Sequence, residues 1–207
     1  MYRRMAGIYI NLEDSSGSLL AQRSRLNVLS RYVRALCREI GHYGASHAEI
    51  ETLEALYIAG PLHLLTDELQ QTLVETVVSD FDATALREFT VELEPLQASA
   101  AYLDDLEARG CNRIHLRARA LFDEDLLSLG CNYFASDVHE AIELIEASRI
   151  NRLSVELCYD IPTQPFEYWA ANLEKRAHRK VKHVSLRPFD EDALLGLPRQ
   201  LACCFFF

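Results

Sequence analysis

Short apolar runs alternate along the chain with longer segments whose apolar residues recur every three or four positions. The runs have the length of β-strands, and the spacing in the longer segments is typical of amphipathic helices. In the helix predicted over residues 26–40, for example, Leu29, Val33 and Leu36 share one side. The predicted strands cover residues 6–12, 55–59, 89–93, 113–116, 153–157 and 181–186. Strands that alternate with helices predict a parallel sheet with the helices outside it, an α/β fold.

Helix boundaries are predicted from glycine and from short polar side chains. Gly41 and Gly44 are expected to end the first helix, because glycine is common just beyond a helix C-terminus. Thr66 and Ser136 are expected to be N-caps, since a side-chain oxygen there accepts a hydrogen bond from a backbone N–H of the first turn. Two further helices are predicted over residues 100–108 and 166–177.

The length of the chain and its net charge limit the domain organisation and the kinds of partner that we expect. The 207 residues fit one domain over residues 1–207, with an apolar tail over residues 197–207. The net charge of −10 argues against a nucleic-acid partner, because such partners are bound by Lys and Arg. The sequence has no apolar run of about 18 residues and no secretory signal, so we expect a cytoplasmic protein without a membrane span. The six cysteines form no C-x-x-C pair, and we expect reduced thiols.

Four segments resemble the motifs of a known family in their residues and in their order along the chain. Residues 8–12 read I-Y-I-N-L, residues 90–95 read T-V-E-L-E-P, residues 110–116 read G-C-N-R-I-H-L, and residues 156–165 read E-L-C-Y-D-I-P-T-Q-P. They resemble the I-Y-I-H-I, T-L-E-A-N-P, G-V-N-R-L-S-L-G-V-Q and D-L-I-Y-G-L-P-G-Q-T motifs of radical S-adenosylmethionine (SAM) enzymes of the oxygen-independent coproporphyrinogen III oxidase and haem-chaperone family. The resemblance covers residues 7–188 and implies a partial (β/α)6, TIM-like barrel.

The loop after the first strand departs from the family pattern. In the family it holds three cysteines that bind an iron–sulfur cluster, because thiolates are the usual cluster ligands. Here residues 13–18 read E-D-S-S-G-S, Ser15 aligns with the first cysteine, and no cysteine precedes Cys37. We therefore expect a pseudoenzyme with no catalytic residue, no bound metal and no cluster, acting as a binding, regulatory or assembly subunit. The family's C-terminal domain is also expected to be absent.

The resemblance marks four positions of a vestigial SAM pocket: Tyr9, Gly60, Glu92 and Glu156. Glu92 and Glu156 lie near the C-terminal ends of their predicted strands, where barrels bind ligands, although solvated strand-end carboxylates are the simpler interpretation. The family's glutamine in G-V-Q falls near Arg119, and its arginine in G-R-x-H falls near Cys131.

Two alternative functions stay open. The first is an active coproporphyrinogen III oxidase-like oxidoreductase that draws cluster ligands from elsewhere, such as Cys111 and Cys131. The second is a cluster-free protein that binds haem or another tetrapyrrole through His63 or His115, or SAM without a 4Fe-4S cluster. The expected partner is an unknown protein or a second copy of the chain. The tail, which ends C-C-F-F-F, is expected to pack across an open barrel edge or to mediate association.

Overall fold

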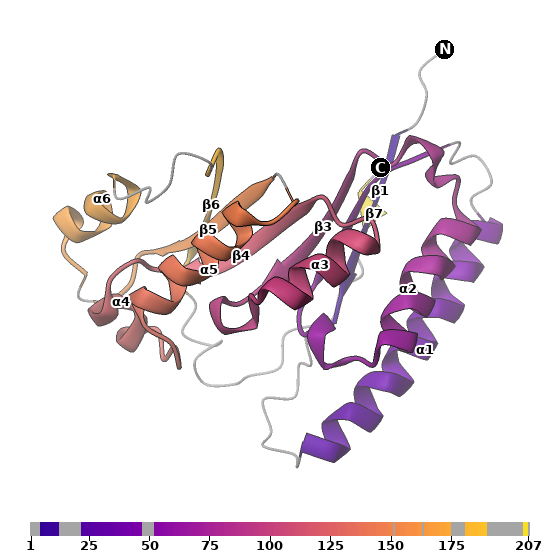
Figure 1. Ribbon diagram of the computed structural model, residues 1–207, viewed down its shortest axis with the longest axis horizontal. Coiled ribbons are helices and arrows are strands. Elements are labelled where there is room, and N and C mark those ends of the chain that lie inside the picture. The colour runs from indigo at the N-terminus through magenta and orange to yellow at the C-terminus, as the bar shows by residue number, and fades with distance from the viewer. Residues whose placement is uncertain are drawn as a thin grey trace. The chain divides into compact units, whose positions relative to one another are not determined.

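The computed structural model describes residues 5–12, 22–46, 52–150, 152–162, 164–174, 181–189 and 205–206 (Figure 1). The chain divides into two compact units. The first unit is Met1–Thr90 together with Pro198–Phe207, and the second is Val91–Leu197. In the described residues, no helix is both long enough and apolar enough to cross a membrane.

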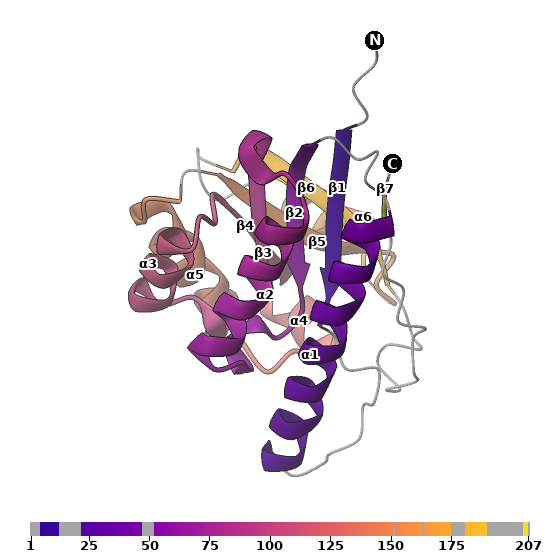
Figure 2. The ribbon, with the colours of Figure 1, turned by 90° about the vertical axis from the view of Figure 1, so that its right-hand side faces the viewer.

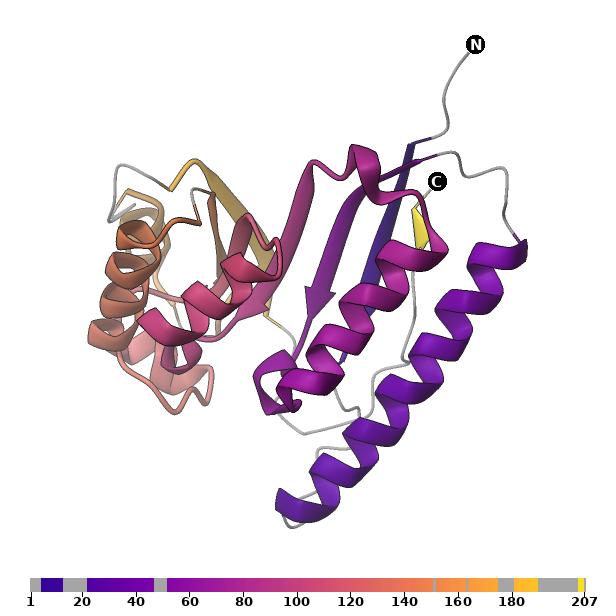
Figure 3. The same ribbon diagram turned by 45° about the vertical axis from the view of Figure 1, so that its right-hand side comes forward.

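The described part of the first unit contains two parallel strands, two α-helices and a short third strand. Its elements are β1 (Met5–Asn11), α1 (Gln22–Ser46), β2 (Thr52–Ala59), α2 (Asp67–Asp80) and the short β7 (Phe205–Phe206). β1 pairs in parallel with β2, from Met5 opposite Thr52 to Asn11 opposite Ala59. On its other edge β1 pairs with β7 in the antiparallel sense. The helices α1 and α2 run beside each other over one face of β1 and β2 (Figures 2 and 3).

The predicted end of the first helix is wrong. Gly41 and Gly44 lie inside α1, which continues to Ser46. A Cβ atom on Gly44 would lie 2.7 Å from the backbone oxygen of Asp80, the last residue of α2. Glycine at this position therefore lets α1 approach the end of α2 rather than stopping the helix.

One of the two predicted N-caps is confirmed. The Thr66 side chain accepts a hydrogen bond of 3.4 Å from the backbone N–H of Leu69. Ser136, however, lies inside its helix, α5 (Ala135–Ala147). The N-cap position belongs to Phe134, whose backbone N–H donates to the Asp137 carboxylate at 2.7 Å. Asp137 thus satisfies the N–H of the N-cap residue itself, whereas the hydroxyl of an N-cap serine would accept from an N–H of the first turn.

The second unit continues the alternation of strands and helices. Its elements are β3 (Glu88–Leu93, which begins in the first unit), α3 (Ala100–Ala108), β4 (Arg113–Arg119), α4 (Asp123–Ser128), α5, β5 (Leu153–Tyr159), α6 (Phe166–Glu174) and β6 (His183–Pro188). The hydrogen-bonded order is β3-β4-β5-β6, and β5 is parallel to both β4 and β6. All six predicted parallel-sheet strands and the predicted helices are therefore present. β2, β3, β4 and β5 are longer than predicted, whereas β1 and β6 have the predicted length and are displaced along the chain.

One face of the second unit's strands is apolar and packed. Ile114, Leu116 and Ala118 alternate along β4 and are fully buried. The helix α5 packs against β4 and buries Val138, Ala141, Ile142 and Ile145. Because successive side chains of a strand point to opposite faces, the residues between them face the other way. That other face carries the candidate site.

Candidate functional site: a polar face on strands β3 to β6

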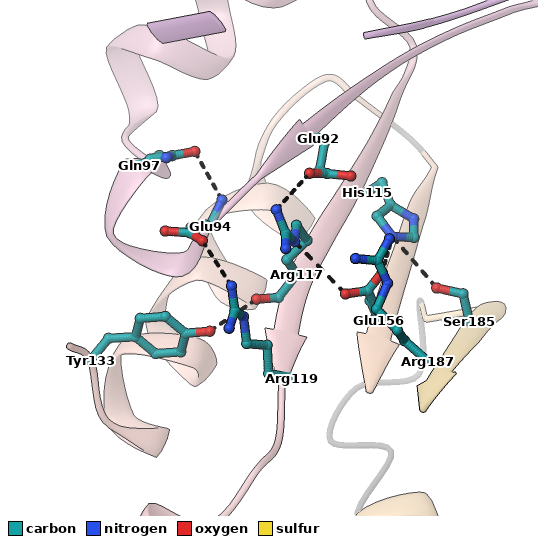
Figure 4. A network of polar contacts seen from close by, with 10 residues as sticks. All are labelled: Glu92, Glu94, Gln97, His115, Arg117, Arg119, Tyr133, Glu156, Ser185 and Arg187. Carbon is teal, nitrogen blue, oxygen red and sulfur yellow. Dashed lines mark hydrogen bonds and ion pairs between the residues drawn. The ribbon is translucent and has the colours of Figure 1, made fainter. Parts of the chain in front are cut away.

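Charged and polar residues occupy every second position along neighbouring strands of the second unit. This polar face consists of Glu92 and Glu94 from β3 and its end, Arg113, His115, Arg117 and Arg119 from β4, Ser154 and Glu156 from β5, and His183, Ser185 and Arg187 from β6. Figure 4 shows most of these side chains converging between the strands. The period of two places the residues up to the middle of β4 on the face opposite α5. The β4–β5 register shifts between Leu116 and Arg119, and Arg119 belongs to this polar face through its ion pair with Glu94.

Arg117 lies between two buried carboxylates. Its NH1 atom is 3.1 Å from Oε1 of Glu92, and its Nε atom is 3.7 Å from Oε1 of Glu156 (Figure 4). The three side chains are 13%, 7% and 6% exposed. One guanidinium on the middle strand thus compensates the charge of a carboxylate on each side of it.

The second oxygen of Glu156 faces two further groups. Nε of Arg187 is 3.3 Å from Oε2 of Glu156, and Nε2 of His115 is 3.6 Å from the same oxygen. Nε2 of His115 also lies 3.5 Å from the Ser185 hydroxyl. Burial acts to raise the pKa of Glu156, but the hydrogen bond from His115 and the charges of Arg187 and Arg117 outweigh it and lower this pKa. Glu156 is therefore ionised at neutral pH and unsuited to donate a proton.

A second, more exposed ion pair lies at the end of β4. NH2 of Arg119 is 3.5 Å from Oε1 of Glu94, and these side chains are 29% and 37% exposed. The φ angle of Arg119 is +61°, in the left-handed region that non-glycine residues rarely adopt. Tyr133 donates a hydrogen bond of 3.1 Å to the backbone oxygen of Arg117, and burial raises the pKa of its phenol. The neighbouring carboxylates at positions 92 and 94 thus pair with different arginines.

The structure brings together two of the four predicted pocket residues. Glu92 and Glu156 meet at Arg117, and both are buried, so they are not solvated strand-end carboxylates. Tyr9 and Gly60 belong to the first unit. Tyr9 stacks on Tyr57 with ring centroids 5.2 Å apart, and Gly60 follows β2 with a φ of +87°. Binding of SAM by these four residues stays a prediction.

The two histidines considered for haem ligation have different surroundings. His63 is exposed in a short 3-10 helix, Leu62–Leu64, of the first unit. His115 is buried in the polar face, and its Nε2 atom already faces Glu156 and Ser185. Its ring therefore acts as a hydrogen-bonding member of the ion-pair network.

The described residues do not fit an iron–sulfur cluster. Among them there is no group of three or more His, Cys, Asp or Glu residues that could hold a metal ion. Burial raises the pKa of Cys111 to about 12 and also raises that of Cys158, which disfavours the thiolate that a cluster requires. Ser15 and the rest of the loop over residues 13–21 lie outside the described residues.

Sequence reasoning missed the residue at the centre of the site, Arg117, together with Ser185 and Arg187. A signal was present, because residues 113–119 read R-I-H-L-R-A-R, with a cationic or polar residue at every second position. Such alternation predicts a strand with one polar face. It does not say which carboxylates on other strands lie opposite.

Comparisons with known proteins support the resemblance. No family model matches the chain. The chain is 27% identical over 160 residues to the haem chaperone HemW of Lactococcus lactis, covering 76% of this chain and 41% of that protein. It is 28% identical over 141 residues to the mouse mitochondrial radical S-adenosyl methionine domain-containing protein 1, covering 66% of this chain and 31% of that protein. The chain thus spans less than half the length of these relatives.

Solved structures show the same fold. The coproporphyrinogen III oxidase HemN of Escherichia coli, a radical SAM enzyme, matches with a TM-score of 0.69 and 18% identity over 91% of this chain and 44% of that chain. The Elp3 protein of Methanocaldococcus infernus matches with a TM-score of 0.61 and 14% identity over 89% of this chain and 46% of that chain. The α/β fold of a partial, TIM-like barrel and the resemblance to HemN-like radical SAM proteins are both confirmed.

Proposed function

We propose that this chain, a relative of the HemN-like radical SAM proteins, does not cleave SAM and acts as a binding, regulatory or assembly subunit in the cytoplasm. One observation carries the proposal. The loop after β1 reads E-D-S-S-G-S, and no cysteine occurs among residues 1–36. Serine hydroxyls are poor substitutes for thiolates as ligands of an iron–sulfur cluster.

The polar face supports the same proposal. Glu92, Glu94 and Glu156 each form an ion pair with an arginine of the chain. The partners of Glu156 lower its pKa, so this carboxylate stays ionised near neutral pH and is unsuited to act as a general acid. The other face of these strands is apolar and well packed, as in a stably folded domain. A binding role requires such a domain, and loss of catalysis does not remove it.

Anaerobic reconstitution with ferrous iron and sulfide tests the proposal. We expect well below one cluster per chain, measured by iron analysis and by the visible charge-transfer absorption. A stoichiometry of about four irons per chain with cluster absorption would overturn it. The matched control is a Cys111→Ser, Cys131→Ser double variant. Cluster binding that this variant abolishes would establish the active-enzyme alternative with ligands from these positions.

A cluster-free tetrapyrrole binder is the second candidate function. It is favoured by the similarity to a protein named as a haem chaperone and by the exposure of His63. Haem titration followed by the Soret band tests it, with His63→Ala and His115→Ala as the matched pair of variants. A Soret shift that His63→Ala abolishes and His115→Ala leaves intact would support this function. A wild-type titration with no saturable shift would exclude it.

A further inference from the structure

Arg117 occupies the position of a ligand between two carboxylates. β4 carries the guanidinium, and the carboxylates come from β3 on one side and β5 on the other. A guanidinium has five N–H donors in a planar fork, and it stays protonated at any physiological pH. NH1 of Arg117 donates a hydrogen bond of 3.1 Å to Glu92, and its Nε faces Glu156 at 3.7 Å, a distance typical of an ion pair without a hydrogen bond. The site thus has the features of a cation-binding site whose occupant is a side chain of the same protein.

The arginine at this position departs from the motif that the segment resembles. In G-V-N-R-L-S-L-G-V-Q the eighth residue is glycine, and the eighth residue of the corresponding segment here is Arg117. A glycine would leave the space between the two carboxylates open. The long side chain fills that space and brings in a positive charge.

We propose that Glu92 and Glu156 form a recognition site for a small planar organic cation of the guanidinium class, and that Arg117 occupies this site as an internal ligand. While the side chain is in place, this part of the polar face is closed to an external ligand. Withdrawing the side chain leaves two buried carboxylates around a cavity of guanidinium shape. Glu156 keeps its contacts with Arg187 and His115. Glu92, however, loses the guanidinium that lies 3.1 Å away, and losing that contact at a buried carboxylate favours binding of a replacement cation.

The inference does not depend on whether the protein is catalytically inactive. Reconstitution of a cluster would overturn the proposed function and leave the internal ion pair unchanged. Conversely, failure of the experiment below would show that Arg117 is an ordinary structural ion-pair partner, with no consequence for the cluster.

Chemical rescue of an Arg117→Ala variant tests the proposal. We expect its melting temperature to fall by roughly 10 °C, because one partner of a buried ion pair is lost. Methylguanidinium, added up to ~20 mM, is expected to restore part of this loss with saturation, whereas equal concentrations of sodium chloride are not. The matched control is Arg149→Ala, whose guanidinium is 80% exposed and lies 3.8 Å from Glu107. It should show neither the loss nor the recovery.

A double variant and a refolding comparison keep the result decisive. Glu92→Gln combined with Arg117→Ala removes one of the two carboxylates and should abolish most of the recovery. Recovery that is unsaturable, equal with sodium chloride, or unchanged in the double variant would overturn the proposal. If Arg117→Ala does not fold alone, the same salts are compared during refolding. Folded protein that is obtained with methylguanidinium but not with sodium chloride supports the proposal. If neither salt yields folded protein, the proposal is refuted.

Discussion

Gly44 of α1 and Asp80 at the end of α2 lie so close that a Cβ atom on Gly44 would be 2.7 Å from the Asp80 backbone oxygen and 2.9 Å from its Cβ atom. Real Cβ atoms do not approach backbone atoms so closely, so the two helices can meet here only because residue 44 is glycine. A neighbouring glycine, Gly41, is less restricted. Its added Cβ would lie 3.3 Å from a carboxylate oxygen of Asp80, which can move away.

The two glycines therefore predict opposite effects of alanine. Gly44→Ala should lower the free energy of unfolding by about 1–2 kcal/mol, because the overlap with α2 exceeds the helix-propensity gain of roughly 1 kcal/mol. Gly41→Ala should be neutral or stabilising by up to about 1 kcal/mol. Urea denaturation of both variants measures the difference. Equal stability of the two variants would contradict the close approach of the helices.

These glycines show what local sequence patterns can and cannot predict. The apolar periodicity of residues 26–40 correctly indicates a helix, because that pattern depends only on which side of the helix is buried. The requirement for glycine at position 44 comes from Asp80 of α2, which is distant in the chain and close in space. From the sequence alone, Gly44 indicates the end of a helix. The structure shows that it is instead the point where α1 contacts α2.

The candidate site also contains residues that the sequence predicted and residues that it did not. Glu92 and Glu156 were found from motif resemblance, and their strand-end position followed from the predicted strands. Arg117 was not found, because its role depends on which side chains of β3 and β5 lie opposite it. Which residues lie opposite each other is set by the register between two strands. The residues of one strand do not show how it is aligned with its neighbour.

Glu92 in β3 and Glu94 just after it should differ sharply in their contribution to stability. Glu92→Gln removes the charge of a buried side chain that lies 3.1 Å from Arg117. We expect a loss of about 3 kcal/mol in the free energy of unfolding, since Arg117 loses a buried partner. Glu94→Gln should cost less than about 1 kcal/mol, because the Arg119 pair is longer and more exposed. Equal costs in guanidinium-free urea denaturation would show that Arg117 does not depend on Glu92.

The C-terminal strand should protect the edge of β1. Gly7 pairs with Phe206 and Ile8 with Phe205, so β7 occupies backbone groups at an edge that would otherwise be open to another chain. Truncation after residue 201 should expose that edge and raise the sedimentation mass through self-association. A Phe205→Ser, Phe206→Ser variant, which retains the backbone, is the control for loss of apolar side chains. A truncated protein with unchanged sedimentation mass and stability would mean that β7 does not protect the edge.

Glu156 should make stability fall on acidification. Its pKa is lowered in the folded protein from the ordinary value of 4.5, because the favourable hydrogen bond from His115 and the charges of Arg187 and Arg117 outweigh burial. In the window between the ordinary and the lowered pKa, the unfolded chain binds more protons than the folded one. The stabilisation is therefore complete above the ordinary value and is lost as the pH falls through the folded value.

A Glu156→Gln variant isolates this contribution. It should be less stable than the wild type by about 3 kcal/mol at pH 7, because Arg117 and Arg187 lose a buried partner. The difference should shrink as the pH falls below the ordinary carboxyl value of 4.5, since the wild-type carboxylate then loses its charge as well. Urea denaturation across this range measures it, with Glu94→Gln as the control for removing one negative charge from the same face. A difference that stays constant or grows in acid would show that the ion pairs of Glu156 do not stabilise the folded protein.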